Sequence, residues 1–189
     1  MYILIIARGY PTEKYKMNGI FEFDQAKALA QAGHKVIYAG IDVRSIRKWR
    51  KWGFESFVKD GVQIEAINIA CGRIPNYILN KIKKDSLKRL YKKIFNKYGE
   101  PDIIHSHFIG MGYITAELFK NSGIQLIHTE HHSRMNQDEL SGYHQTLGNN
   151  TYLYMEKVIT VSKYLADNLK NKFGVKATVI PNMVDTESF

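Results

Sequence analysis

Cysteine is nearly absent from this 189-residue chain, which carries Cys71 alone. A single thiol cannot form a disulfide within the chain, so a disulfide framework is excluded and a reducing, cytoplasmic location is expected. Long apolar runs are absent too: no stretch of about 18 hydrophobic residues occurs, and we predict no transmembrane helix. The apolar opening, Met1–Ile6, is too short for a signal peptide and lacks a basic flank, so we interpret it as a buried strand.

Several common catalytic motifs are also missing. The sequence contains no G-x-S-x-G elbow, no Walker loop and no G-x-G-x-x-G fingerprint, and a dinucleotide-binding interpretation loses its main support. Histidines are numerous near candidate strand ends, but they lack the helical i, i+4 spacing and the cysteine partners of familiar zinc motifs. We therefore expect no metal or other cofactor.

The chain does contain a regular alternation of short β-branched runs and longer amphipathic segments. The strand candidates are Ile3–Ile6, Lys35–Gly40, Val62–Ile69, Ile103–His107, Gln125–Thr129, Val158–Val161 and Thr178–Ile180. The helix candidates are Gly19–Ala32, Tyr77–Tyr98, Gly112–Asn121, Gln137–Tyr154 and Lys163–Lys172. This alternation predicts an α/β, Rossmann-like, doubly wound and mostly parallel sheet of about seven strands with helices on both faces. Residues 1–180 are expected to form one domain, in which Ile41–Asp60, the least regular region, is a long loop or short helix.

Ligands of open parallel sheets bind beyond the carboxyl ends of the strands, so the residues after each run are site candidates. Arg8 and Tyr10 follow the first strand, and Asn18 and Gly19 open the next helix. Asn18 is a favourable N-cap, and Gly19 lets an anion approach the exposed backbone N–H groups. An ordinary capped helix would carry the same residues, because a lone glycine is weak evidence for a site.

Two further strand ends carry histidine. The alternation of side chains along a strand places His105 and His107 on one face. A hydrogen-bonded core histidine is the structural alternative for both, and it is the role that we expect for His105. The richest polar cluster follows the next strand and contains Thr129, Glu130 and His131, with His132 beside them. Its structural alternative is a set of caps for the following helix.

The final segment, from Val158 to Asp185, has the pattern of a strand, a helix, a second strand and a Pro-Asn turn. Together with the D-I-I-H-x-H strand and the Thr129-x-His131 pattern, it resembles the N-terminal, acceptor-side domain of family-4-type, retaining glycosyltransferases of the GT-B fold. Their first domain ends in a viPNGvD segment, in which Met183 here replaces the usual glycine. The resemblance spans essentially the whole chain.

The resemblance implies a role for each candidate residue. His131 would lie beside the donor sugar and the acceptor hydroxyl and take part in catalysis as a neutral imidazole. The residues implied to contact donor phosphates or acceptor are Gly19, Asn18, Arg8 and Tyr10, and those implied to bind the acceptor are His107, Thr129 and Glu130. Residues 181–189 would begin a linker to a second domain that holds the nucleotide-sugar, and Ser162 would be a structural helix cap.

Charge gives a second indication of partners. The chain has 27 basic and 18 acidic residues, a formal net charge of +9. The excess is concentrated in Arg44–Trp52 and Lys81–Lys97. Tryptophan among cations is typical of an interface with anionic lipid headgroups, so peripheral membrane attachment is one hypothesis. A solvated helix face with a basic loop is the alternative. Nucleic acid is not expected, because no motif that binds it accompanies the charge.

We therefore expect a glycosyltransferase domain of polysaccharide biosynthesis. It would help to transfer a hexosyl group from a nucleotide-sugar to a hydroxyl of a glycan or lipid-linked acceptor, with retention, and would be inactive without its second domain. The alternative is a non-catalytic sugar- or anion-binding domain that works with a partner subunit. Such a domain would share the loop that contains Asn18 and Gly19, here called the glycine loop, but would not need His131.

Overall fold

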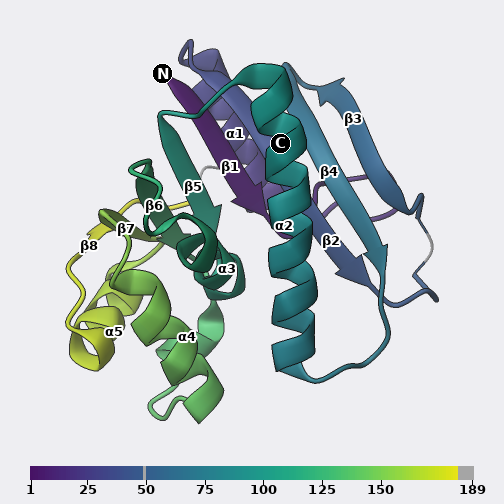
Figure 1. The fold of residues 1–189 in the computed structure, drawn as a ribbon. Helices are drawn as coiled ribbons and strands as arrows, with labels where there is room; N and C mark the ends of the chain where they lie inside the picture. Colours follow the sequence, from purple (N-terminus) through teal and green to yellow (C-terminus); the bar gives the residue numbers. More distant parts are fainter. Residues whose placement is uncertain (49, 183–189) are drawn as a thin grey trace.

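The computed structural model describes residues 1–48 and 50–182 and shows a single sheet flanked by helices (Figure 1). The strands are β1 (Tyr2–Ala7), β2 (Lys35–Arg44), β3 (Gly53–Lys59), β4 (Val62–Ala70), β5 (Ile103–His107), β6 (Gln125–Glu130), β7 (Lys157–Thr160) and β8 (Ala177–Val179). The helices are α1 (Ile20–Gln31), α2 (Asn76–Tyr98), α3 (Ile109–Phe119), α4 (Gly142–Tyr152) and α5 (Lys163–Phe173), with a short 3-10 helix η1 (Ser133–Asn136).

The strand order defines where a ligand site can form. The sheet runs β3-β4-β2-β1-β5-β6-β7-β8, and every neighbouring pair is parallel except β3 with β4. β1 lies at the centre, paired with β2 on one side and with β5 on the other. The chain therefore winds outward from β1 in both directions, and a crevice opens at this switch point, beyond the carboxyl ends of β1 and β5.

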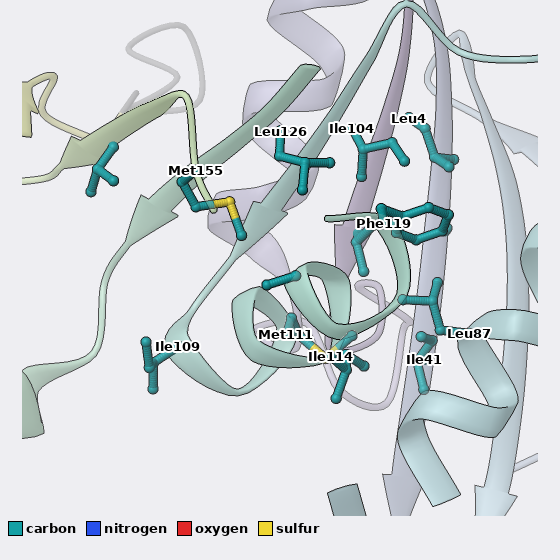
Figure 2. Packing of buried hydrophobic residues seen from close by; sticks show 14 of the residues in the cluster. Leu4, Ile41, Leu87, Ile104, Ile109, Met111, Ile114, Phe119, Leu126 and Met155 are labelled. Carbon is teal, nitrogen blue, oxygen red and sulfur yellow. The ribbon is translucent and has the colours of Figure 1, made fainter. Parts of the chain in front are cut away.

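Alternating side chains of β1 divide the core between the two faces of the sheet. Ile3 and Ile5 join the cluster to which α1 contributes Phe23 and Ala26. Leu4 and Ile6 join the larger cluster with residues of α2, α3, α4 and α5. Figure 2 shows Leu4 and its strand neighbours facing α3, with Leu87 of α2 beside them. Because each fully buried Leu or Ile side chain contributes about 1.5–3 kcal/mol, this two-sided burial holds β1 rigidly at the site. The predicted doubly wound α/β fold is confirmed.

The region Ile41–Asp60 differs from the predicted long loop or short helix. β2 continues to Arg44, and β3 forms an eighth, antiparallel strand at the sheet edge. The exposure of β3 alternates along its length, and Phe54 and Val58 are exposed. An edge strand that is covered on a single side buries few apolar groups. For this reason the β3 sequence lacks the continuous hydrophobic run of the central strands.

The helix predicted over Gln137–Tyr154 is wrong in its first part. Gln137 ends the short helix η1, and α4 begins only at Gly142, where Ser141 accepts a hydrogen bond from the backbone N–H of His144. No helix in the described part of the chain is both long and apolar enough to cross a membrane. Trp49 and residues 183–189, which include Met183 and most of the predicted linker, lie outside the described residues.

Candidate functional site

The switch point brings two of the predicted site residues to the ends of neighbouring strands. Arg8 directly follows β1, and His107 ends β5. The Arg8 guanidinium lies 3.2 Å from the centroid of the Phe108 ring, and the Phe108 ring stacks on that of His131 with centroids 4.8 Å apart. Phe108 has a φ of +62°, a conformation that non-glycine residues adopt at a cost and that clusters at functional sites. Phe108 thus connects Arg8 with His131 at the crevice.

His107 and His131 form a direct pair between β5 and the end of β6. The Nδ1 atom of His107 lies 3.1 Å from the Nε2 atom of His131, and Phe21 of α1 stacks on the outer side of the His131 ring. The remaining ring nitrogens, Nε2 of His107 and Nδ1 of His131, are buried and have no hydrogen-bond partner among residues 1–48 and 50–182. A neutral imidazole carries one N–H, so whichever histidine donates within the pair determines which outer nitrogen is a donor.

Burial keeps these imidazoles neutral at physiological pH. It lowers the pKa of His131 to about 4, with the charge of His128 adding to the effect and that of Glu130 opposing it. Burial also lowers the pKa of His107 well below its usual value, and the nearby histidines contribute. His105 is the more internal partner that the sequence predicts: its Nε2 atom lies 2.8 Å from Oγ1 of Thr129, and burial lowers its pKa to about 3. A neutral imidazole can both accept and donate a proton at the site.

Glu130 lies beneath the histidine pair and faces inward, where its carboxylate is fully buried. One oxygen accepts the backbone N–H groups of His131 at 3.0 Å and of His132 at 2.8 Å. The other accepts the Tyr152 hydroxyl at 2.9 Å and faces Nε2 of His128 at 3.3 Å. Burial by itself would raise the pKa of Glu130, but the His128 contact and the other donors lower it. Glu130 therefore fixes the backbone that carries His131.

The glycine loop is closed by a buried tyrosine. The Tyr38 hydroxyl donates to the carbonyl oxygens of Gly9 at 2.6 Å and Gly19 at 3.3 Å. Gly19 has a φ of +71°, and a Cβ atom there would lie 2.5 Å from the Gly9 carbonyl oxygen. This close approach requires glycine at position 19, and a Cβ atom at Gly9 would lie 2.2 Å from the Asn18 amide nitrogen. Gly19 is also the N-cap of α1 and receives no side-chain cap, so the expectation that Asn18 caps the helix is wrong.

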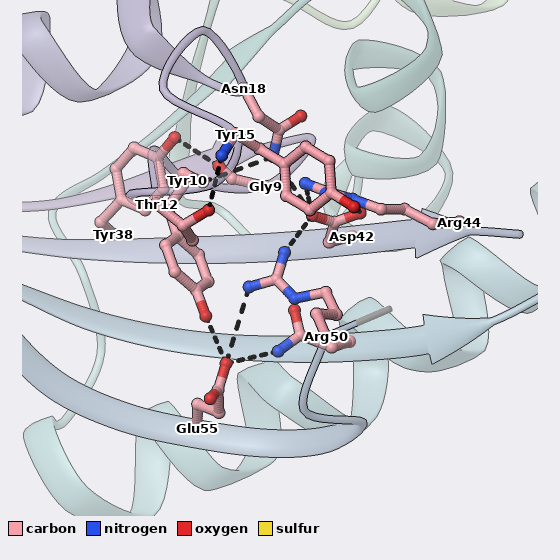
Figure 3. A network of polar contacts seen from close by, with 11 residues as sticks. Gly9, Tyr10, Thr12, Tyr15, Asn18, Tyr38, Asp42, Arg44, Arg50 and Glu55 are labelled. Atoms are coloured by element: carbon pink, nitrogen blue, oxygen red, sulfur yellow. Dashed lines mark hydrogen bonds and ion pairs between the residues drawn. The ribbon is translucent and has the colours of Figure 1, made fainter. Parts of the chain in front are cut away.

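Asn18 instead belongs to a buried ionic network behind the loop (Figure 3). Its amide nitrogen donates to Asp42 at 3.1 Å. Asp42 also accepts two hydrogen bonds from Arg44, at 2.7 and 2.6 Å, and pairs with Arg50. Tyr10 is buried, stacks beneath the Arg50 guanidinium and donates its hydroxyl to Glu55 of β3. Tyr10 therefore braces the network rather than facing the crevice.

The network forms one wall of the principal cleft, whose volume is about 680 Å³. Its described lining residues are Arg8, Tyr15, Met17, Asn18, Gly19, Ile41, Asp42, Val43, Arg44, Ser45, Lys48, Lys83 and Met111. Three of the predicted site residues, Arg8, Asn18 and Gly19, thus share one hollow. His131 lines a much smaller neighbouring cavity of about 20 Å³ together with Phe21, Pro181 and Asn182.

Sequence reasoning missed Phe21, Phe108, Lys48 and Lys83 as parts of this region. Phe21 and Phe108 are hydrophobic residues next to predicted helix starts, and nothing in their local pattern distinguishes them from core positions. Lys83 was visible only as one member of a basic helix. The prediction for Ser162 is confirmed, because its hydroxyl accepts the backbone N–H of Leu165 at the start of α5.

Acidification is expected to destabilise the fold before ordinary carboxylates titrate. His105, His107 and His131 are neutral in the folded chain, with pKa values of about 3 for His105 and about 4 for His131, whereas unfolded histidines titrate near 6.5. Unfolding between about pH 6.5 and pH 4 therefore takes up roughly two to three protons, and stability is lost as pH falls through that window. Urea unfolding midpoints measured at half-unit pH steps test this.

The variant His105→Gln is the matched control for the pH experiment. Glutamine can keep the hydrogen bond to Thr129 but cannot bind the extra proton, so the slope of stability against pH should fall by roughly one proton. A wild-type midpoint that stays constant from pH 6.5 to pH 4.5, or an unchanged slope in the variant, would contradict the burial of neutral histidines.

The described residues hold no group of three or more histidine, cysteine, aspartate or glutamate side chains placed to bind a metal ion. The described neighbours of the His107–His131 pair, such as Phe21 and Phe108, stack on it and could not serve as a third metal ligand. What the arrangement offers is a pair of neutral imidazoles, an uncapped helix N-terminus and a cationic cleft. Such an arrangement can hold an anion and can exchange hydrogen bonds with a polar ligand.

Comparison with solved structures shows that this architecture is the Rossmann-like fold of one half of several GT-B proteins. Sucrose-phosphate synthase from Thermosynechococcus elongatus is 18% identical, with a TM-score of 0.64 over 100% of this chain and 92% of that one. The catalytic domain of starch synthase IV from Arabidopsis thaliana, bound to ADP and acarbose, is 16% identical with a TM-score of 0.64, over 100% and 52%. Anabaena HepE, in complex with UDP and glucose, is 15% identical with a TM-score of 0.59, over 98% and 45%.

Residues 23–188 match the family Glycosyltransferase Family 4, and the chain belongs to that family. The structure corresponds to one Rossmann-like half of the GT-B fold, and the chain spans about half the length of the starch synthase and HepE chains that it matches. A search of curated sequences finds no match.

Proposed function

We propose that this chain is the acceptor-side domain of a glycosyltransferase that moves a hexosyl group from a nucleotide-sugar to a hydroxyl of a glycan or lipid-linked acceptor, with retention. The observation that carries the proposal is the neutral His107–His131 pair beside the uncapped N-terminus of α1 at the sheet's switch point. Family membership supports the transferase class. ADP bound to the starch synthase and UDP bound to HepE support a nucleotide-sugar donor.

The chemical role that we propose for the chain follows from the His107–His131 pair. During transfer, the acceptor oxygen bonds to the anomeric carbon, the nucleoside diphosphate leaves with the bonding electrons, and the proton of the acceptor hydroxyl passes to an oxygen of the leaving diphosphate. If Nδ1 of His107 donates to Nε2 of His131, then Nδ1 of His131 carries an N–H that can hold a sugar oxygen. The first-turn N–H groups of α1 would stabilise the negative charge of the departing diphosphate.

The second half of the reaction site is assigned to a following nucleotide-sugar domain. Residues 181–189 would begin the linker to it. Domain closure over the cleft would exclude water from the reacting atoms. The 189-residue chain by itself is therefore proposed to be inactive.

A donor panel tests the proposed activity. The chain alone and a protein that joins it to its nucleotide-sugar domain would be incubated with UDP-, GDP- and ADP-hexoses and candidate acceptors, and release of nucleoside diphosphate would be measured. The proposal predicts release by the two-domain protein only, and proton NMR of the product should show the anomeric configuration of the donor. Inversion would refute retention, and sugar binding without transfer would favour the non-catalytic alternative.

We propose that the protein attaches peripherally to a membrane, where it would meet a lipid-linked acceptor. Arg44 and Arg50 of the first basic cluster are buried in ion pairs, so they do not supply a lipid-binding surface. The exposed cations of α2, which include Lys88, Arg89, Lys92 and Lys93, remain for that role. Co-sedimentation with anionic vesicles should therefore fall as salt rises and be lost with neutral vesicles. Equal recovery with both vesicle types would refute the proposal.

A further inference from the structure

The principal cleft carries more positive charge than its own acids balance. Its described lining residues include four cations, Arg8, Arg44, Lys48 and Lys83, and a single carboxylate, that of Asp42. Asp42 is already paired with two guanidinium groups, those of Arg44 and Arg50. It therefore has no capacity left to balance the charges on the open side of the cleft.

Lys83 and Lys48 are the cations without a partner. Among residues 1–48 and 50–182, neither ammonium group forms a salt bridge or a hydrogen bond. Lys83 is half-buried on α2, and its pKa is lowered by burial and by the charge of Arg8 across the cleft. Like charges that face one another in a partly desolvated hollow are unfavourable, and a bound anion removes that cost.

Arg8 connects this charge to the histidine pair. Its nearest carboxylate is the buried Glu22, with Oε1 at 3.5 Å from Nε, and its guanidinium stacks on Phe108, which in turn stacks on His131. An anion held between Arg8 and Lys83 would thus lie near Phe108, the ring that contacts both Arg8 and His131. The hydroxyl and the anion can belong to the same ligand.

We propose that the acceptor is a phosphorylated sugar, whose phosphate is bound in the cleft by Lys83, Lys48 and Arg8 while its hydroxyl points to His131. The inference rests on the proposed function and specifies its acceptor. A cleft of about 680 Å³ is within the size range of small-ligand sites, and ammonium and guanidinium groups are the usual partners of phosphate oxygens. The phosphate can be that of a soluble sugar phosphate or that of a sugar joined through a diphosphate to a lipid.

Binding to the 189-residue chain tests the proposal without requiring turnover. Calorimetric titrations would use glucose 6-phosphate, glucose 1-phosphate, N-acetylglucosamine 1-phosphate and a hexose linked through a diphosphate to a short prenyl chain. Free glucose and UDP would be titrated in parallel. At least one phosphorylated sugar should bind while glucose does not, and raising the salt concentration should weaken the binding. Which probe binds distinguishes the soluble source from the lipid source.

Lys83→Met is the diagnostic variant, and Lys170→Met, which removes an exposed lysine of α5, is its matched control. Losing one charge-assisted contact should raise the Kd of the phosphorylated sugar about tenfold to a hundredfold in Lys83→Met, and the Kd should not change in Lys170→Met. Circular dichroism melts should confirm that both variants fold.

Three results would overturn the proposal: binding of none of the phosphorylated probes, equal binding of glucose, or a Kd that does not respond to Lys83→Met. UDP binding that alone depends on Lys83 would also overturn it, because the anion would then be that of the donor. These outcomes are separate from failure of the proposed function, which the donor panel measures as absence of transfer by the two-domain protein.

Discussion

Replacing His131 by alanine should reduce kcat of the two-domain enzyme by about 10² to 10³, the usual cost of removing one positioned hydrogen-bond donor from the transition state. The substitution removes the imidazole that pairs with His107 and leaves the fully buried His107 ring without its hydrogen-bond partner. Since His131 is assigned to the transition state rather than to substrate binding alone, kcat should fall more than KM rises. Steady-state rates with saturating donor and acceptor measure the effect.

His132→Ala is the matched control for this experiment. Its side chain accepts a hydrogen bond from the backbone N–H of Arg134 and caps the short helix η1, so kcat should stay within about threefold of wild type. Loss of the cap should appear in thermal stability instead. If His131→Ala and His132→Ala have the same kcat, His131 has no chemical role and the non-catalytic alternative gains support.

Replacing Asp42 by alanine should be the most destabilising single change in the cleft wall, at about 3–5 kcal/mol. Asp42 is buried and is shared by Arg44, Arg50 and Asn18. Its removal leaves two buried guanidinium groups without this carboxylate, and the ion pair that Arg50 keeps is the longer one to Glu55, at 3.7 Å. The melting temperature should fall by roughly 10 °C or more.

Asp167→Ala provides the comparison for Asp42, because it removes the same side chain from an exposed ion pair. Asp167 pairs with Lys163 one helical turn away, and both side chains are largely exposed. Such pairs contribute at most about 0.5 kcal/mol, so this variant should melt close to wild type. Equal melting temperatures for Asp42→Ala and Asp167→Ala would show that the buried network does not stabilise the fold.

The alternation of strands and helices could be predicted because the central strands are buried on both faces. Strands such as β1 must then be continuously apolar, and this signal survives in a single sequence. The edge strand β3 escaped prediction because it buries only part of one face. The end of β2 was missed because Asp42 and Arg44 are polar residues that are buried by pairing with each other, which no hydrophobic pattern reveals.

The candidate site was predictable only in part. The histidines are recognisable because they lie at strand ends, where a parallel sheet gathers its ligand-binding residues. The direction of each side chain could not be predicted. Glu130 lies next to His131 in sequence but turns inward, and the Tyr10 hydroxyl donates a hydrogen bond to Glu55 of β3. Lys83 comes from a helix far along the chain, so its place in the cleft depends on how α2 crosses the sheet.

The inward carboxylate of Glu130 has an evolutionary consequence. It accepts the backbone N–H of His131 from the protein interior and is itself held by His128 and Tyr152. Glu130, His128 and Tyr152 are not among the residues that line the principal cleft. Three of the cleft cations come from other segments: Arg44 ends β2, Lys48 follows it, and Lys83 lies in the first half of α2. Residues that select a ligand can therefore be exchanged in a descendant lineage while the histidine keeps its orientation.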